Sequence, residues 1–108
     1  MKRLFVLLAV LAAAAAIEWA TCETCRLSLM GIKLFIDIDA NSSVKEVSGA
    51  TCQPIKKVGA KKSAQLCDRI IRQTMRSPLL MKKIKDNKGT GWEKKFCAKE
   101  MKKKYCNQ

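Results

Sequence analysis

The chain has 108 residues, a formal net charge of +13 and no histidine. Its length allows a single domain of ordinary size. The lack of histidine excludes Ser-His-Asp triads, Cys-His pairs and histidine metal ligands. We therefore expect a protein that is not an enzyme and that needs no cofactor and no metal.

Residues 1–16 have the pattern of a secretory signal peptide. A basic pair and an apolar run precede Ala14 and Ala16, whose spacing is typical of a cleavage site. We expect cleavage after Ala16, with cleavage after residue 20 as the alternative, and a single domain over residues 17–108. A membrane anchor is the other interpretation, but the apolar stretch has 14 residues and a spanning helix needs about 20.

The rest of the chain combines six cysteines with a segregated charge. An even number of cysteines in a short secreted chain is typical of a disulfide framework. A zinc site at Cys22-x-x-Cys25 is the alternative, but neither a second such pair nor a histidine follows. Residues 17–51 carry a net charge of −2 and residues 52–108 carry +13. Bridges would hold together a domain that is small and repels itself.

Apolar residues at three- and four-residue steps predict a first helix over about residues 22–38. Residues 32–39 alternate, so a short strand there is the alternative. The turn that follows contains Asn41 in an N-x-S sequon, where we expect glycosylation in a eukaryotic secretory route.

A capping-box spacing at Ser43 and Glu46 predicts a second helix that ends near Cys52. Because a proline breaks a helix interior, Pro54 predicts that residues 53–62 form a basic connection.

Three further helices are predicted in the basic half. Ser63 is expected to cap a third helix from Ala64 to Arg76, and Ser77-Pro78 opens a short fourth helix. A second capping box, Thr90 to Glu93, predicts a last helix. The apolar residues of that helix would be Trp92, Phe96, Met101 and Tyr105.

The expected helices reduce the fifteen pairings that six cysteines allow. A bridge between Cys22 and Cys25, one turn apart, would constrain nothing distant. Two bridges from the first helix to the last and one across the middle hairpin give the expected set: Cys22–Cys106, Cys25–Cys97 and Cys52–Cys67. Nine positions of an ideal helix rotate by about 900°, so Cys97 and Cys106 both reach the first helix only if the last helix ends before Cys106.

With this nested order the sequence resembles the saposin-like (saposin B-type) family. The segments TCETCRLSLM and LCDRIIRQTMRS are similar to the granulysin and NK-lysin branch, and the resemblance covers essentially the whole mature chain. The spacings from Cys52 to Cys67 and from Cys97 to Cys106 are longer than is usual in that family. The resemblance implies an all-α, compact bundle of four to five helices stapled by three disulfides, which binds lipid.

The positive charge favours the antimicrobial and cytolytic members over acidic lipid-extracting ones, because each lysine or arginine gains about 1 kcal/mol near an anionic membrane. We expect a secreted protein, extracellular or held in secretory granules, that disrupts anionic bilayers and forms homo-oligomers on them. Phe96 could enter the membrane in place of Trp92, although Ile70, Ile71 and Phe96 also suit an ordinary core. The expected membrane contacts are Arg69, Arg72, Arg76, Leu79, Leu80, Met81, Lys82, Lys83, Lys85 and Trp92.

Three other functions are compatible with the sequence. The first is a non-lytic lipid carrier or hydrolase activator of the saposin type. The second is binding of nucleic acid or another polyanion, which is disfavoured because aromatic residues are few, no stacking-module signature occurs and the chain is expected to be secreted. The third is a venom or signalling peptide on the same scaffold.

Overall fold

The computed structural model describes residues 20–107, and the expected signal peptide over residues 1–16 lies outside them. The described residues form helices and connecting segments without a strand, so residues 32–38 are helical. The helices are α2 (Thr21–Ile38), α3 (Val44–Lys57), α4 (Lys61–Met75), α5 (Pro78–Asp86) and α6 (Trp92–Lys99). The expectation of an all-α bundle is confirmed.

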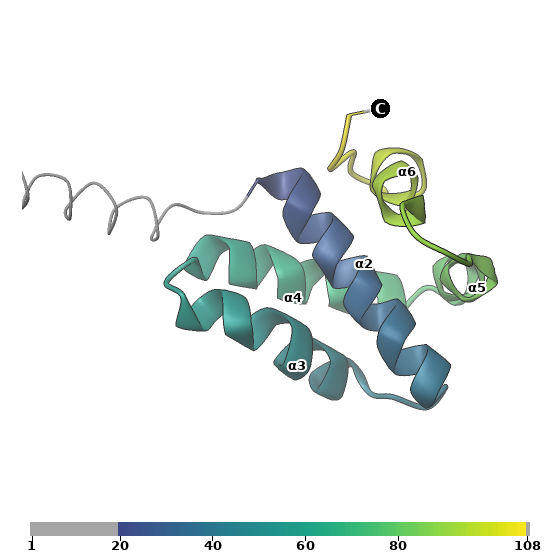
Figure 1. Cartoon of the computed structure of the whole chain (residues 1–108), viewed down its shortest axis with the longest axis horizontal. Coiled ribbons are helices and arrows are strands. Elements are labelled where there is room, and N and C mark those ends of the chain that lie inside the picture. Colours follow the sequence, from purple (N-terminus) through teal and green to yellow (C-terminus); the bar gives the residue numbers. More distant parts are fainter. Residues whose placement is uncertain (1–19, 108) are drawn as a thin grey trace, which may run out of the picture.

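The bundle is built on a hairpin of α3 and α4, which α2 crosses (Figure 1). Helix α5 packs against α2 and α4, and α6 packs against α2. Fully buried aliphatic side chains from four helices fill the space between them, as expected for amphipathic helices. The largest are Leu29, Ile32, Val47, Ile55, Ile70, Ile71 and Ile84.

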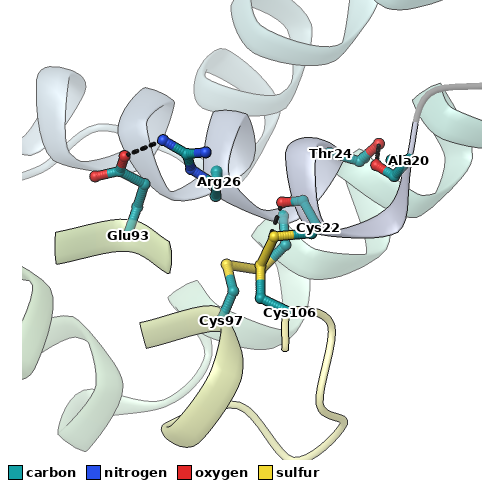
Figure 2. Close-up of a disulfide and its surroundings, with 8 residues drawn as sticks. Ala20, Cys22, Thr24, Arg26, Glu93, Cys97 and Cys106 are labelled. Atoms are coloured by element: carbon teal, nitrogen blue, oxygen red, sulfur yellow. Dashed lines mark hydrogen bonds and ion pairs between the residues drawn. A yellow bond between two sulfur atoms is a disulfide. The ribbon is translucent and has the colours of Figure 1, made fainter. Parts of the chain in front are cut away.

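Three disulfides hold this arrangement, and they are the expected ones. Cys22 pairs with Cys106 and Cys25 with Cys97, which ties the start of α2 to α6 and to the chain that follows it. The bridge from Cys52 to Cys67 joins α3 to α4. The two outer bridges lie next to each other, and Figure 2 shows Cys22, Cys97 and Cys106 together at the junction of the two elements. Since Cys22 and Cys25 are both bridged, the zinc alternative is excluded.

Polar contacts add two more links to α2. The guanidinium of Arg26 lies 3.1 Å from a carboxylate oxygen of Glu93 in α6, and the Glu93 side chain is almost fully buried (Figure 2). The ammonium of Lys33 donates a hydrogen bond to the carbonyl of Lys85 in α5 and pairs with Asp37 one turn further along α2. Helices α5 and α6 are therefore each anchored to α2 by a charged side chain of α2.

The expected break of the second helix at Pro54 is wrong, because α3 continues to Lys57. Proline at this position removes the hydrogen bond to the carbonyl of Ala50, and its ring crowds that carbonyl. Both residues are exposed, so water can satisfy the carbonyl. The bridge at Cys52 and the burial of Ile55 hold the last turn of α3 against the bundle.

The expected cap of the third helix is also wrong. Helix α4 starts at Lys61 with Ala60 at the N-cap position, and Ser63 is buried in its first turn. The reason is the tight turn before it: Gly59 has a φ of 92°, in the left-handed region that glycine tolerates, and it reverses the chain within three residues. The connection expected over residues 53–62 is therefore limited to residues 58–60, which carry no charge, and the lysines expected in it lie in the last turn of α3 and the first turn of α4.

At the fourth helix the expected cap is confirmed, since the Ser77 hydroxyl accepts a hydrogen bond from the amide of Leu80. The last helix differs at both ends. Gly91, with a φ of 86°, occupies its N-cap position in place of Thr90, and the carboxylate of Glu93 faces Arg26 and not the helix start.

Helix α6 ends at Lys99, so Met101 and Tyr105 are buried in the segment beyond it and not within the helix. The amides of Tyr105 and Cys106 both donate to the carbonyl of Cys97, which folds this segment back. Because α6 ends before Cys106, both Cys97 and Cys106 can reach α2, as the two outer bridges require.

Candidate functional site

The arginines expected at the membrane line one groove. Arg69, Arg72 and Arg76 are exposed and recur at three- and four-residue steps, which places them on one face of α4 and at its C-cap. With residues of α3 they form a groove of about 880 Å³, which we call the α3–α4 groove. Its lining residues are Ser48, Cys52, Gln53, Lys56, Lys61, Ala64, Gln65, Asp68, Arg69, Arg72, Gln73 and Arg76.

The α3–α4 groove has one acidic side chain. Asp68 accepts a hydrogen bond from the Ser48 hydroxyl and another, of 2.8 Å, from Nε of Arg72. The hydrogen bond from Ser48 lowers the pKa of Asp68, and Arg72 lowers it further, against a partial opposing effect of desolvation. Asp68 is therefore ionised at neutral pH and compensates only one of the five cations in the groove.

The residues expected from the fourth helix are divided between surface and core. Leu79 is 62% exposed, whereas Leu80 and Met81 are half-buried and pack against the core. Lys82 and Lys85 are exposed on the surface of α5. Lys83 is also exposed, and its ammonium pairs with Glu100. The apolar run 79–81 therefore presents one large side chain to solvent, because three consecutive helix positions face different directions.

Trp92 is half-buried at the start of α6. Its ring makes an edge-to-face contact with Phe96, with ring centroids 5.8 Å apart and planes at 85°. Phe96 is buried, as are Ile70 and Ile71, so the core interpretation of these three residues is confirmed. Trp92 lies at the edge of two surface depressions, one toward α5 and one toward α2.

The depression toward α2 is a second groove, and the sequence did not reveal it. We call it the α2 groove; its volume is about 750 Å³. Leu27, Met30 and Leu34 of α2 line it, together with residues 50, 51, 54 and 55 of α3 and residues 89–93. Met30 is 50% exposed and Leu34 is 61% exposed. The signal that could have found it is the recurrence of Met30, Leu34 and Ile38 at four-residue steps, in addition to the core-facing stripe of the same helix.

Asn41 is exposed in the turn between α2 and α3, where its backbone N–H donates a hydrogen bond to the Asp39 carboxylate. Its glycosylation stays a prediction.

None of the helices within residues 20–107 has the length and hydropathy needed to cross a membrane. In comparisons with known proteins, no protein-family model, no curated protein and no solved structure matches this chain.

Proposed function

We propose that this chain is a divergent saposin-like protein, secreted and not an enzyme, that binds anionic bilayers and disrupts them. The helical bundle, the nested order of its bridges and the net charge of +13 on residues 52–108 support this proposal. Disulfides of this density are typical of proteins from oxidising compartments, which supports secretion. Its partners would be anionic lipids and, on the membrane, further copies of the chain.

The observation that carries the proposal is the exposed Leu79 among unpaired cations. Arg76 lies at the C-cap position of α4, three positions before Leu79 in the chain, and Lys82 lies three positions after Leu79 on the same face of α5. Among the described residues neither cation has an ion pair. Cations near an anionic surface contribute about 1 kcal/mol each, and burial of a leucine contributes about 1.5–3 kcal/mol. These residues can therefore contact headgroups and the acyl boundary together.

Dye release from vesicles tests this function. We expect the oxidised protein to release dye from phosphatidylglycerol vesicles, with little release from phosphatidylcholine, and release should rise with the anionic fraction. Leu79→Ser should weaken membrane binding about tenfold, as loss of one buried leucine predicts. Val58→Ser is the matched control, because Val58 is 55% exposed and lines neither groove.

Equal release from anionic and neutral vesicles, or no release from either, would refute the proposal. Reduction of the bridges should abolish release, because the bridges hold the helices that present the cations and Leu79 together.

The α2 groove favours a second candidate function, a non-lytic lipid carrier or hydrolase activator. Its exposed Met30 and Leu34 offer an apolar surface large enough for part of an acyl chain. Native mass spectrometry after incubation with vesicles distinguishes the two functions. A carrier would retain lipid in stoichiometric amount and transfer it between vesicles without dye release, and Leu34→Glu would abolish retention.

A further inference from the structure

The α3–α4 groove is a polar site set apart from the apolar one. All of its lining residues come from α3, from α4 and from Arg76 at the end of α4, and none comes from α2, which lines the apolar groove. Its volume of about 880 Å³ is in the range of sites that hold a small molecule. A ligand there would contact the hairpin without entering the core.

The positive charge of the groove favours a ligand that carries more than one anionic group. Lys56 lies on the α3 side, and Lys61, Arg69 and Arg76 lie along α4. No ion pair involves any of these four cations within residues 20–107. Several uncompensated cations in one depression attract an anion more strongly than the same number spread over the surface. A ligand with two or more phosphates would match them.

One arginine is already oriented. The Nε atom of Arg72 donates to Asp68, and the Ser48 hydroxyl holds the same carboxylate from α3. The terminal nitrogens of Arg72 are the donors left for a ligand. A guanidinium fixed in this way loses less side-chain entropy when it binds a phosphate with two parallel hydrogen bonds.

The groove also contains three amides that a bare phosphate would not use. Gln53, Gln65 and Gln73 line it and are exposed, and no hydrogen bond of their side chains occurs in the described part of the chain. A primary amide both donates and accepts, as the hydroxyl groups of a sugar ring do. Amides interspersed with cations suit a ring that carries hydroxyls as well as phosphates.

We propose that the α3–α4 groove binds a polyhydroxylated ring, a sugar or an inositol, that carries two or more phosphates. As the headgroup of a lipid, such a ring would be one of the anionic components of the bilayers that the proposed function requires, and to that extent this inference rests on the proposed function. The same ring occurs free in solution, and the groove recognises the chemistry that both sources share.

Isothermal titration of the oxidised protein with inositol 1,4,5-trisphosphate in 150 mM salt tests the site without a membrane. We expect saturable binding, weaker binding of tripolyphosphate and none of myo-inositol. The double variant Arg69→Gln/Arg76→Gln should lower the affinity for the trisphosphate at least tenfold. Lys102→Gln/Lys104→Gln removes the same charge from exposed positions outside the groove and should lower it less than twofold.

The amides are tested separately. Gln65→Met/Gln73→Met keeps the charge and the side-chain length, and should weaken the trisphosphate several-fold while leaving tripolyphosphate unchanged. Equal losses in the groove and control double variants would overturn the site, since they would reveal only unspecific charge attraction. Tripolyphosphate binding as tight as the trisphosphate would overturn the assignment of a hydroxylated ring.

Two vesicle types of equal charge density separate the sources. If the groove takes a lipid headgroup, Arg69→Gln/Arg76→Gln weakens binding to vesicles that contain phosphatidylinositol bisphosphate more than binding to phosphatidylglycerol vesicles. If the protein binds the trisphosphate but the double variant loses binding equally on both vesicle types, the groove is supported as a site for a ring that is free in solution. Dye release without trisphosphate binding refutes this inference and leaves the proposed function standing, and trisphosphate binding without dye release does the reverse.

Discussion

Asp68 lines the α3–α4 groove, and the charge of its carboxylate contributes to the stability of the fold. Its pKa is lowered by the hydrogen bond from Ser48 and by Arg72. A carboxyl group whose pKa is lower in the folded state stabilises the fold above the pKa of the unfolded chain, about 3.9. This stabilisation is lost as the pH falls through the folded-state pKa.

Asp68→Asn should therefore lower the free energy of unfolding by about 1 kcal/mol at pH 7, a modest value because Asp68 and Arg72 are partly exposed. At low pH, well below the pKa of about 3.9 of an unfolded aspartate, the difference from the unmodified protein should shrink, because Asp68 takes up a proton there and becomes uncharged, as the asparagine of the variant always is. Urea unfolding at the two pH values measures it. Asp86→Asn, at an exposed position of α5, is the control and should stay within about 0.5 kcal/mol at both. An equal cost of Asp68→Asn at both pH values would contradict the role of its charge.

At the scale of the elements, two helical glycines differ in their surroundings: one lies where two helices pack closely, and the other lies in open space. A Cβ atom on Gly31 of α2 would lie 2.2 Å from Oγ1 of Thr51 and 3.0 Å from its Cβ, so rotation of the threonine side chain cannot remove the clash. A Cβ atom on Gly49 of α3 would meet nothing within 4 Å. Gly31 therefore permits the close approach of α2 and α3, whereas Gly49 only weakens its helix.

We expect Gly31→Ala to destabilise the protein by about 1–3 kcal/mol, as overpacking does. Gly49→Ala should stabilise it by about 0.5–1 kcal/mol, because alanine is the better helix former and the site is open. Thermal unfolding followed by circular dichroism measures both. A stabilising effect at Gly31 would mean that α2 and α3 do not approach this closely.

The order and the inner faces of the helices could be predicted because apolar spacing reports directly on burial, as at Leu29 and Ile70. The ends could be predicted only where a local signal met no competitor, as at Ser77. At Pro54 the exposed surface and the tertiary packing outweighed a local rule. At Glu93 a distant partner, Arg26, took the side chain that the capping box requires. The spacing of neighbouring residues does not indicate a contact between residues 67 positions apart.

For the whole molecule, the sequence predicts the charge of each half but not which face carries it. The arginines of α4 gather with Lys56 and Lys61 because α3 and α4 form a hairpin. The exposed stripe of Met30 and Leu34 lies in a different groove, since the opposite side of α2 is needed for the core. Which cations and apolar residues share a face depends on how the helices cross, and helical periodicity does not contain that information.

The two outer disulfides act as one constraint on this crossing. Cys22–Cys106 spans 84 positions and Cys25–Cys97 spans 72, but once either is formed the other closes a ring of roughly a dozen residues. In the chain-entropy model such a ring contributes about 3 kcal/mol, and a loop of about 80 residues contributes about 4.5 kcal/mol. Loss of one bridge should therefore cost far less than loss of both.

We expect Cys22→Ala/Cys106→Ala and Cys25→Ala/Cys97→Ala each to lose about 3 kcal/mol and to keep a cooperative urea transition. The quadruple variant should lose about 7–8 kcal/mol, which is comparable to the whole stability of a small domain, and should be unfolded without denaturant. Cys52→Ala/Cys67→Ala opens a loop of 15 residues within the hairpin, so its cost of about 3 kcal/mol should add independently to that of either outer variant. A quadruple variant that still unfolds cooperatively would show that non-covalent contacts, the Arg26–Glu93 ion pair among them, hold α6 on α2, because no disulfide would then join the two helices.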